Sequence, residues 1–343
     1  MARFRVALSG DFRKADGTPA YPMFDLAPLT SDPEIEIFYV DAIDDVMPAE
    51  RLQGVDALIL LAHRFTAASI PRDGRLALVA RFGVGYDSVD VAACTAADIG
   101  VAITPDGVRR PVAVAVITFV LALAGKLLIK DRLTRQGAWA EKSRHMGVGL
   151  TGRTLGQLGL GNIGAEVFRL AAPFGMRFIA HDPFADAELA RSLGVQLVSL
   201  EELFRQSDFL SVSVPLSEDT RGLVDAEKLA WMKPSAFLIN TARGPVVNQR
   251  DLHDALVAGR ISGAGLDVFD IEPVAKDEPL LRLDNVIVTP HALCWTDECF
   301  ARIGASDVAS VLAIKRGEAP AALVNREVAE RTGFREKLAR YRA

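Results

Sequence analysis

Three charged residues each follow an apolar, strand-like run in the second half of this 343-residue sequence. Arg243 follows "AFLINTA", Glu272 follows "GAGLDVFDI" and His291 follows "NVIVTP". Open α/β sheets bind ligands beyond the carboxyl ends of their strands, so we expect these side chains to converge. The set suits hydride transfer to a 2-keto acid. Arg243 would grip the substrate carboxylate, His291 would exchange a proton with the keto oxygen, and Glu272 would orient His291.

Each of these residues also has an ordinary structural explanation. A histidine after a strand is commonly a capped surface residue, and an arginine in a turn is commonly solvated. Glu272, which precedes Pro273, could be a simple loop carboxylate. Their joint occurrence after a dinucleotide-binding pattern favours the catalytic interpretation.

That pattern is "GLGNIG", which follows a predicted strand and opens a predicted helix. In this setting the backbone N–H groups and the positive end of the helix bind a pyrophosphate. Asp182 ends the next predicted strand, at the offset expected for a carboxylate that accepts from a ribose hydroxyl. Because a carboxylate repels a 2′-phosphate, Asp182 favours NAD over NADP. The predicted loop residues are Gly159, Gly161, Asn162, Ile163 and Gly164.

Apolar runs alternate with helical segments along the chain, which predicts an α/β fold with two doubly wound parallel sheets. The apolar stretch 111–125 and a helical stretch near 296–316 separate two blocks. We therefore expect a discontinuous, flavodoxin-like substrate-binding (catalytic) domain, residues 1–108 and 296–343. An NAD-binding Rossmann domain, residues 109–295, would be inserted into it. The charged tail 326–343 is expected to fray.

Composition narrows the class of protein. The net charge of −5 gives no electrostatic footprint for nucleic acid or for an anionic membrane, so we expect neither as a partner. Cys94, Cys294 and Cys299 form no CxxC pair, which fits a reducing cytoplasm and gives no sign of a metal site. The uncharged stretch 111–125 is short for a bilayer and indicates a buried helix.

The chain resembles the D-isomer-specific 2-hydroxyacid dehydrogenases, the family that includes phosphoglycerate, glyoxylate/hydroxypyruvate and D-lactate dehydrogenases. The resemblance runs almost continuously from Leu155 to Leu293, and "ARFGVGYDSVDV" (80–91) adds a motif in the first block. The matching stretches in the second block are "QLGLGNIG", "HDPF", "SVSVPLSEDTRGLV", "MKPSAFLINTARGPVVNQRDLHDAL", "GAGLDVFDIEP" and "NVIVTPHAL".

The resemblance implies that Arg243, Glu272 and His291 form the catalytic set and that Asp267 holds the nicotinamide amide. It implies that the backbone N–H groups of Val84 and Gly85 bind the substrate carboxylate. The chain departs from the family pattern at Val116, where many members carry Glu, and at Cys294 and Trp295, where small residues are common. The further cofactor-binding residues that it implies are Val214, Pro215 and Thr220, which border the adenine side, with Thr241, Ala242 and Ala292.

Loops of the first block would select the substrate side chain, and His63, Arg64 and Phe12 are the candidates. Arg64 could bind a distal hydroxyl or carboxylate, or lie in solvent. We expect a small polar D-2-hydroxy acid or 2-keto acid, of the hydroxypyruvate, glyoxylate or sugar-acid type. The alternatives are a phosphite- or formate-type dehydrogenase of the same fold and a non-enzymatic, NAD-sensing scaffold like the corepressors.

The Gly-rich segment 137–156 is interpreted as an extended arm, with a dimerisation arm at about 130–152. Its Trp139 is expected to be buried, either under its own domain or against a partner subunit. The resemblance favours the partner subunit. We therefore expect a homodimer, with Trp139, Arg144, His145 or Met146 near the partner's active-site mouth.

Overall fold

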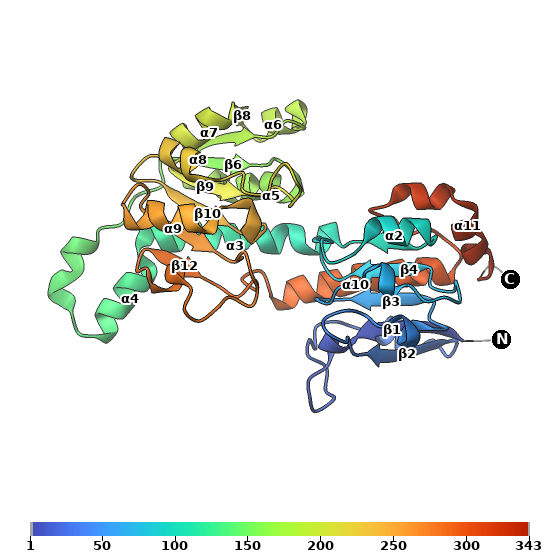
Figure 1. Ribbon diagram of the computed structural model, residues 1–343. Helices are drawn as coiled ribbons and strands as arrows, with labels where there is room; N and C mark the ends of the chain where they lie inside the picture. Colours follow the sequence, from blue (N-terminus) through green and yellow to red (C-terminus); the bar gives the residue numbers. More distant parts are fainter. Residues whose placement is uncertain (1–2, 342–343) are drawn as a thin grey trace. The chain divides into compact units, whose positions relative to one another are not determined.

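The computed structural model describes residues 3–341 and divides the chain into two compact units (Figure 1). Unit 1 comprises Met1–Val108 and Trp295–Ala343, and unit 2 comprises Arg109–Cys294. The division expected from the sequence placed the second junction one residue later, after 295. The two outermost residues at each end of the expected substrate-binding domain lie outside the described residues.

Unit 1 is built on a five-stranded sheet in the order β2-β1-β3-β4-β5, and every pair of neighbours is parallel. This is the flavodoxin-like strand order. β3 is buried along its whole length, as the apolar run from Asp56 to Ala62 predicts. The strands are β1 (Phe4–Ser9), β2 (Ile35–Val40), β3 (Ala57–Leu60), β4 (Leu78–Arg81) and β5 (Gly100–Ala102).

Helices cover this sheet, and the longest of them, α10, packs against β3 and β4. The helix begins after Thr296, whose hydroxyl accepts from the N–H of Cys299 at 3.1 Å and so caps the first turn. The helices that lie wholly in unit 1 are α1 (Ala27–Thr30), α2 (Val91–Ala96), α10 (Asp297–Lys315) and α11 (Thr332–Ala339). The short 3₁₀ helices are η1 (Gly10–Phe12), η2 (Ala49–Leu52), η3 (Ala67–Ser69) and η8 (Arg326–Glu330).

Unit 2 is built on a seven-stranded parallel sheet in the order β12-β11-β10-β9-β6-β7-β8. The chain order reverses between β6 and β9, which is the switch point of a Rossmann sheet. The predicted α/β fold class, with two doubly wound parallel sheets, is confirmed. The strands are β6 (Thr154–Leu158), β7 (Arg177–His181), β8 (Val195–Leu197), β9 (Phe209–Val212), β10 (Phe237–Asn240), β11 (Gly263–Leu266) and β12 (Val286–Val288).

Local signals set the helix ends in unit 2. The side chain of Asn248 accepts from the N–H of Asp251 at 3.2 Å and caps α9, and Gly259 just past the helix has a φ of +65°. Both features were predicted for this stretch. The helices are α4 (Leu127–Arg135), α5 (Asn162–Ala171), α6 (Ala187–Ser192), α7 (Leu200–Gln206), α8 (Ala226–Trp231) and α9 (Gln249–Val257). The 3₁₀ helices are η4 (Trp139–His145), η5 (Ala172–Phe174), η6 (Gly244–Val246) and η7 (Pro279–Arg282).

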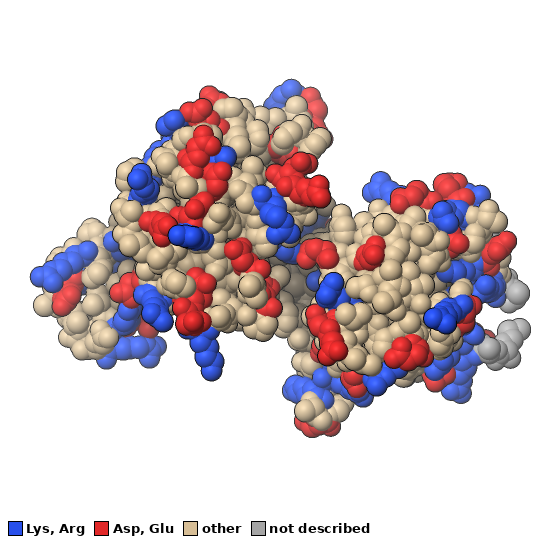
Figure 2. Space-filling model, viewed as in Figure 1, with Lys and Arg blue, Asp and Glu red and all other residues tan. Residues whose placement is uncertain are grey.

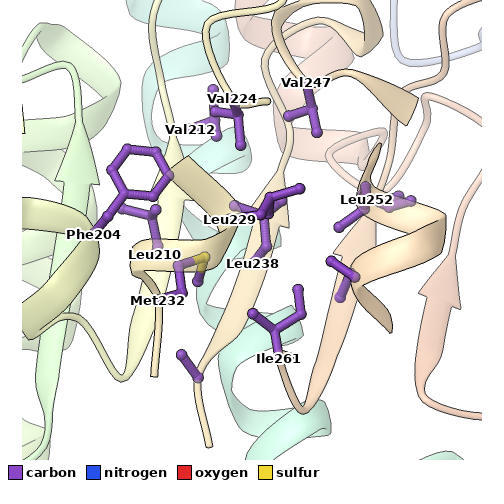
Figure 3. Close-up of a cluster of buried hydrophobic side chains, with 14 of the residues drawn as sticks. Phe204, Leu210, Val212, Val224, Leu229, Met232, Leu238, Val247, Leu252 and Ile261 are labelled. Atoms are coloured by element: carbon purple, nitrogen blue, oxygen red, sulfur yellow. The ribbon is translucent and has the colours of Figure 1, made fainter. Parts of the chain in front are cut away.

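One face of the unit 2 sheet packs on helices that follow the central strands (Figure 3). Leu210 and Val212 from β9 and Leu238 from β10 meet Leu229 from α8 and Leu252 from α9, and all five side chains are at most 1% exposed. Burying a leucine side chain contributes about 1.5–3 kcal/mol to stability. This core fixes β9 and β10, and therefore the loops that leave their carboxyl ends.

Helix α3 (Pro105–Gly125) carries the junction between the units and begins six residues before Pro111, where the sequence suggested a start. Pro111 lies inside the helix, where it cannot donate to the carbonyl of Gly107. Of the described helices, α3 alone is long and apolar enough to cross a membrane by length and composition. In its most apolar window, 56% is buried inside the protein, as in the core helix of a soluble protein.

The surface carries both signs of charge. On the face shown in Figure 2, lysine and arginine side chains are interspersed with aspartate and glutamate over both units. This distribution agrees with the small net charge of −5. That face therefore shows no large patch of positive charge of the kind that attracts nucleic acid.

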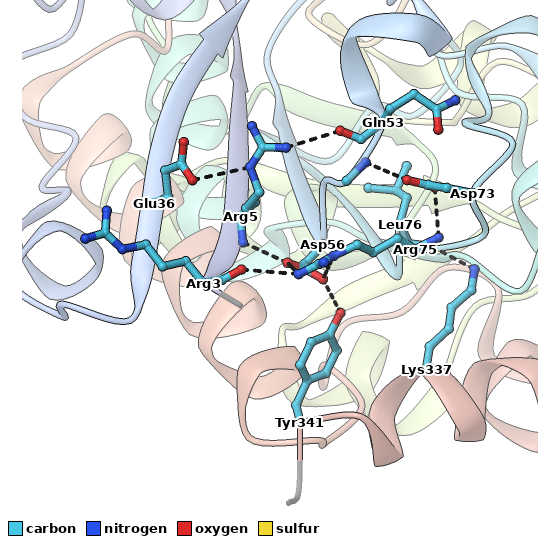
Figure 4. A network of polar contacts seen from close by, with 11 residues as sticks. Arg3, Arg5, Glu36, Gln53, Asp56, Asp73, Arg75, Leu76, Lys337 and Tyr341 are labelled. Atoms are coloured by element: carbon cyan, nitrogen blue, oxygen red, sulfur yellow. Dashed lines mark hydrogen bonds and ion pairs between the residues drawn. The ribbon is translucent and has the colours of Figure 1, made fainter. Parts of the chain in front are cut away.

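The C-terminal segment does not fray as expected but docks on unit 1 through polar groups (Figure 4). The Tyr341 hydroxyl donates to the carboxylate of Asp56, which is fully buried and also accepts from Arg75 Nε at 2.7 Å. Lys337 is 5% exposed and donates from Nζ to the carbonyls of Leu76, Ala97 and Asp98 at 2.8–2.9 Å. Burial lowers the pKa of Lys337 to about 8. Residues 326–341 of the tail are thus part of the fold of unit 1, and the last two residues of the segment expected to fray lie outside the described residues.

Replacing Tyr341 with Phe should therefore destabilise unit 1. The change removes one donor to a buried carboxylate, which is worth about 1.5–3 kcal/mol, while the ring contact with Phe4 remains. Urea unfolding measures the loss of free energy. Tyr39→Phe is the matched control, because the Tyr39 ring packs under Arg13 and its hydroxyl has no hydrogen bond among the described residues. Equal midpoints for Y341F and Y39F would show that the tail adds little.

Candidate active site

The phosphate-binding loop leaves the carboxyl end of β6, at the switch point of the sheet. Gly159 has a φ of +98°, and a Cβ there would lie 2.8 Å from the carbonyl oxygen of Ser213. A Cβ at Gly164 would collide with the carbonyl of Gly159, whereas the space around the corresponding position of Gly161 is open. The glycines therefore let the loop pack closely on β9 and leave its outer side bare.

The first turn of α5 supplies unoccupied donors to this loop. In the part of the chain that the structure describes, the backbone N–H groups of Asn162, Ile163 and Gly164 have no acceptor. Gly161 caps the helix without a side-chain hydrogen bond, and Asn162 is exposed and Ile163 partly exposed, whereas Gly164 is buried. Free N–H groups at the positive end of a helix bind phosphate oxygens.

Asp182 follows β7, as predicted, and its carboxylate ties two backbone segments together. Oδ2 accepts from the N–H of Leu160 at 2.8 Å, and Oδ1 accepts from the N–H of Phe184 at the same distance. His181 beside it is engaged through Nδ1 with the carbonyl of Val198 at 3.0 Å. The carboxylate is thus held rigidly beside the phosphate loop, where a ribose would lie.

The remaining predicted cofactor residues sit on the loops after β9, β10 and β12. The Thr220 hydroxyl donates to the carbonyl of Pro215 at 2.6 Å and accepts from the N–H of Ser217 at 2.8 Å, which closes the loop after β9. Val214 touches the phosphate loop, because its Cγ1 would lie 3.0 Å from a Cβ at Gly159. The unit thus brings the Rossmann-domain cofactor candidates to one edge of its sheet.

Arg243 lies in a turn that the last residue of β10 organises. The side-chain amide of Asn240 donates to the carbonyl of Arg243 at 2.9 Å, and its oxygen accepts from the N–H of Ala242 at 3.0 Å. Arg243 Nη1 donates to the carbonyl of Ala242 at 2.7 Å. A Cβ at Gly244 would collide with the backbone of Phe269 and Asp270. The arginine turn therefore packs directly on the segment that leads to Glu272.

Asp267 is 3% exposed and organises the turn that carries His291. Its Oδ1 accepts from the Thr289 hydroxyl at 2.6 Å and from the N–H groups of Ala292 and Leu293 at 3.0 and 3.1 Å. These bonds surround His291, whose φ of +53° lies in the left-handed region that favours glycine. The strained backbone of this residue persists because the turn around it is tightly bonded.

Glu272 and His291 form a direct pair. Glu272 Oε2 lies 2.7 Å from His291 Nδ1, while Oε1 accepts from the N–H of Phe269 at 2.9 Å. Solvent reaches 44% of the His291 side chain and 35% of the Glu272 side chain.

Burial acts to raise the pKa of Glu272, but the hydrogen bonds from His291 and Phe269 outweigh it. The charges of His291 and Arg243 act in the same direction as those bonds. The net effect lowers the pKa of Glu272, so its carboxylate stays ionised opposite the imidazole.

The predicted substrate residues lie at the carboxyl edge of the unit 1 sheet. His63 has Nδ1 2.8 Å from Asp45 Oδ1 and Nε2 3.8 Å from Asp11 Oδ2, so both ring nitrogens face carboxylates. The Arg64 side chain is exposed. Phe12 is 3% exposed and packs on Phe24 and Phe82, which makes it a core residue rather than a selector of substrate.

Two positions in this site carry roles that the sequence did not reveal. Asn240 is the polar end of an otherwise apolar strand, and Asn commonly bonds its own turn, so its type was a usable signal. Gly244 has no such signal, because its crowding against Phe269 depends on a segment 25 residues away. Asp267 was assigned to the cofactor alone, although one of its oxygens serves the His291 turn.

The residues present fit a dinucleotide on physical grounds. The uncovered N–H groups at the start of α5, the bare outer side at Gly161 and the fixed carboxylate of Asp182 are the features that a pyrophosphate and its ribose require. Oδ1 of Asp267 accepts from Thr289, Ala292 and Leu293.

Residues 117–292 match the family model of the D-isomer specific 2-hydroxyacid dehydrogenases, in its NAD-binding domain. The chain belongs to this family. A glyoxylate reductase of Korarchaeum cryptofilum is 41% identical over 283 residues, which cover 81% of this chain and 85% of that protein. The resemblance seen in the sequence is therefore confirmed.

Solved structures of similar enzymes support the assignment of this chain to the dehydrogenase family. A glyoxylate reductase from Paecilomyes thermophila superimposes with a TM-score of 0.81 at 27% identity, covering 95% of this chain and 100% of that one. A D-lactate dehydrogenase from Aquifex aeolicus, solved with NAD and lactic acid, gives a TM-score of 0.78 at 27% identity, covering 93% and 98%. The protein is an NAD-dependent 2-hydroxyacid dehydrogenase, and its cofactor is NAD.

The preference of this dehydrogenase for NADH over NADPH should depend on Asp182. Asp182→Asn keeps an acceptor oxygen but loses the negative charge, so NADPH binding should tighten by roughly tenfold. Asp182→Ala should also weaken NADH binding, because both the ribose acceptor and the bond to Leu160 are lost. Titration of tryptophan fluorescence measures both dissociation constants. Equal affinity of the unmodified enzyme for the two cofactors would contradict this role.

Proposed function

We propose that this dehydrogenase interconverts a small polar 2-keto acid, of the glyoxylate, hydroxypyruvate or sugar-acid type, and its D-2-hydroxy acid. Arg243, Glu272 and His291 would carry the reaction. The observation that carries the proposal is the contact of 2.7 Å between Glu272 and His291, made at the sheet edge that also holds the arginine turn. A carboxylate-bound imidazole beside a fixed guanidinium suits proton exchange with the oxygen of an anionic substrate.

Arg243 would bind the substrate carboxylate through its planar fork and polarise the keto oxygen. The turn that carries Arg243 supports that task, because the side chain of Asn240 accepts from the N–H of Ala242 and donates to the carbonyl of Arg243. Bound NADH supplies the hydride. The side chain of the arginine thus has to hold the keto carbon of the substrate in place while charge develops on the oxygen.

His291 would donate a proton from Nε2 to the keto oxygen, or accept it from the alcohol in the reverse direction. Since Nδ1 faces Glu272 at 2.7 Å, the other ring nitrogen is the one left for substrate. The ionised carboxylate stabilises the protonated imidazole and fixes the ring plane.

The choice of a small polar substrate rests on unit 1 and on the relatives. The loops after β1 and β3 carry the polar side chains of Asp11, His63 and Arg64. Glyoxylate reductases are prominent among the similar proteins. The odd number of cysteines, none of them in a disulfide within the described residues, supports the proposed cytoplasmic location.

A panel of 2-keto acids with NADH tests the proposed function. Glyoxylate, hydroxypyruvate, pyruvate and phenylpyruvate would be compared by kcat/KM from the loss of NADH absorbance, and formate and phosphite would be assayed with NAD in the opposite direction. The proposal expects glyoxylate or hydroxypyruvate to lead. Faster turnover of phenylpyruvate would reject the substrate class, and turnover of phosphite alone would reject the reaction.

Glu272→Gln should move the pH profile of keto-acid reduction. The glutamine keeps the size of the side chain but no longer stabilises the protonated imidazole. The alkaline limb of kcat/KM should therefore shift to lower pH. His291→Ala should lower kcat by roughly 10²–10⁴-fold and leave NADH affinity intact. An unmoved limb in E272Q would argue against the pair, and near-normal turnover in H291A would remove the histidine from the reaction.

We also propose that the enzyme is a homodimer, with α3, α4 and η4 in the interface. Trp139 is 63% exposed and Met146 is 74% exposed, so Trp139 is not buried under its own domain. Leu127 and Leu128 on α4 are 59% and 49% exposed, and Leu121 on α3 is 45% exposed. A run of exposed apolar side chains on adjoining elements is typical of a subunit interface. The arm residues Arg144 and His145 would then lie near the partner's active-site mouth.

Light scattering behind a sizing column tests the dimer. The unmodified chain should give twice the mass of the 37.0 kDa polypeptide. Leu127→Glu should give the single-chain mass, because it places a charge in the buried interface. Val257→Glu is the matched control, since Val257 is 63% exposed on α9, outside the predicted interface. A single-chain mass for the unmodified protein would refute the dimer, and dissociation of V257E would refute the assigned face.

A further inference from the structure

The turn that follows β4 offers two backbone donors with nothing to bind. Within the described residues, the N–H groups of Val84 and Gly85 have no hydrogen-bond acceptor. Both residues are partly exposed. The preceding residue, Gly83, has a φ of +134°, which L side chains rarely adopt. Two adjacent free donors on a constrained turn suit a carboxylate, provided that something holds the turn in this shape.

Backbone hydrogen bonds hold only the first part of this turn. The N–H of Phe82 donates to the carbonyl of Leu60 at 2.8 Å, and the N–H of Thr104 donates to the carbonyl of Gly83 at 2.9 Å. These bonds join the turn to the ends of the neighbouring strands. Neither bond involves the carbonyl of Phe82, which belongs to the peptide group before Gly83. This carbonyl therefore accepts from another donor.

That donor is Arg81, the last residue of β4. Its Nη1 donates to the carbonyl of Phe82, so the guanidinium folds back over its own turn. A Cβ at Gly83 would collide with Nη1, and it would lie 3.1 Å from Cζ of the same guanidinium. The arginine therefore fills the space that a side chain at Gly83 would need. It also places a positive charge against Gly83, the residue that precedes the two donors.

Asp307 is a buried acidic residue in the same unit as Arg81. It is on α10, which packs against β4, and it is fully buried. Neither of its carboxylate oxygens has a hydrogen-bond partner in the described chain. Complete burial raises the pKa of Asp307 well above its ordinary value, and the charge of Arg81 opposes that shift. Arg81 and Asp307 therefore interact through charge and not through a hydrogen bond of this carboxyl group.

We propose that Arg81 is a positioning residue for the carboxylate of the 2-keto acid. It fixes the turn 82–85 through the carbonyl of Phe82 and raises the positive potential at the N–H groups of Val84 and Gly85. This inference rests on the proposed function, because it takes the substrate to be a 2-keto acid whose carboxylate meets these donors.

A purely structural role for Arg81 is the competing explanation, and unit 1 contains a matched control for it. Arg75 also pairs with a fully buried carboxylate, donating to Asp56 through Nε at 2.7 Å and Nη2 at 2.8 Å. It precedes β4, whereas Arg81 ends that strand. Replacing either arginine with Met should lower the stability of unit 1. Only the replacement of Arg81 should alter the binding of substrate.

The experiment compares Arg81→Met, Arg81→Lys and Arg75→Met in the full-length enzyme. Steady-state kinetics with the best 2-keto acid of the panel gives KM and kcat at saturating NADH. Oxamate, a stable carboxylate analogue of a 2-keto acid, gives an inhibition constant. Fluorescence titration gives the NADH dissociation constant, and thermal unfolding gives the midpoint. Should R81M fold poorly because it strands the buried carboxyl group, the double variant R81M/D307N removes both groups together.

R81M, or the double variant, should raise KM and the oxamate inhibition constant by roughly tenfold, with kcat and NADH affinity little changed. R81K should recover part of the loss, because it keeps the charge but not the bond geometry. R75M should lower the unfolding midpoint and leave KM unchanged. An unchanged KM in R81M and in the double variant would overturn the role of Arg81 and leave the proposed function standing. An equal rise of KM in R75M would also overturn it, and a wild-type enzyme inactive on every 2-keto acid would overturn both.

Discussion

Both sheets of this enzyme are wholly parallel, and this constraint decides where chemistry can occur. In a parallel sheet the carboxyl ends of all strands lie at one edge, so the loops that follow the strands gather there whatever their sequences. In unit 2 this edge collects the phosphate loop, Asp182, the arginine turn and the Glu272–His291 pair from five different strands. In unit 1 it collects the loops after β1, β3 and β4. The residues of each group therefore meet although more than a hundred positions separate some of them.

Hydrogen-bonded carboxylates convert that gathering into fixed geometry. Asp182 and Asp267 accept backbone N–H groups of the loops that they join. Asp56 joins the C-terminal segment to β1, because it accepts from the Tyr341 hydroxyl and from the N–H of Arg5. Asp208 links the start of β6 to Lys233 by accepting from the N–H of Thr154 at 2.8 Å. A carboxylate has two oxygens and four lone-pair positions, so one side chain can fasten several donors. Charged hydrogen bonds of this kind are stronger than neutral ones, which suits loops that must hold a substrate to within a fraction of an ångström.

The sequence predicted the α/β class and the strand ends, because both depend on local patterns of apolar residues and glycines. It also placed the catalytic candidates at those ends, but the 2.7 Å contact of Glu272 with His291 depends on two loops that only the folded sheet brings together. The C-terminal tail was misjudged for the same reason. Lys337 and Tyr341 are polar residues in a charged stretch, and their partners at Leu76 and Asp56 are 261 and 285 positions away. Trp139 was expected to be buried, yet in a single chain most of its surface is exposed.

The absence of a side chain at Gly244 couples two parts of the active site that the chain encodes separately. The turn that carries Arg243 lies so close to the backbone of Phe269 and Asp270 that neither can shift without the other. In evolution, substitutions in one of these loops should depend on the residues of the other. A change that remodels the loop bearing Glu272 succeeds only if the arginine turn still fits beneath it, so variants of the two segments should show strong epistasis. An engineer who seeks a new substrate would do better to exchange both loops from one relative than to combine them from two.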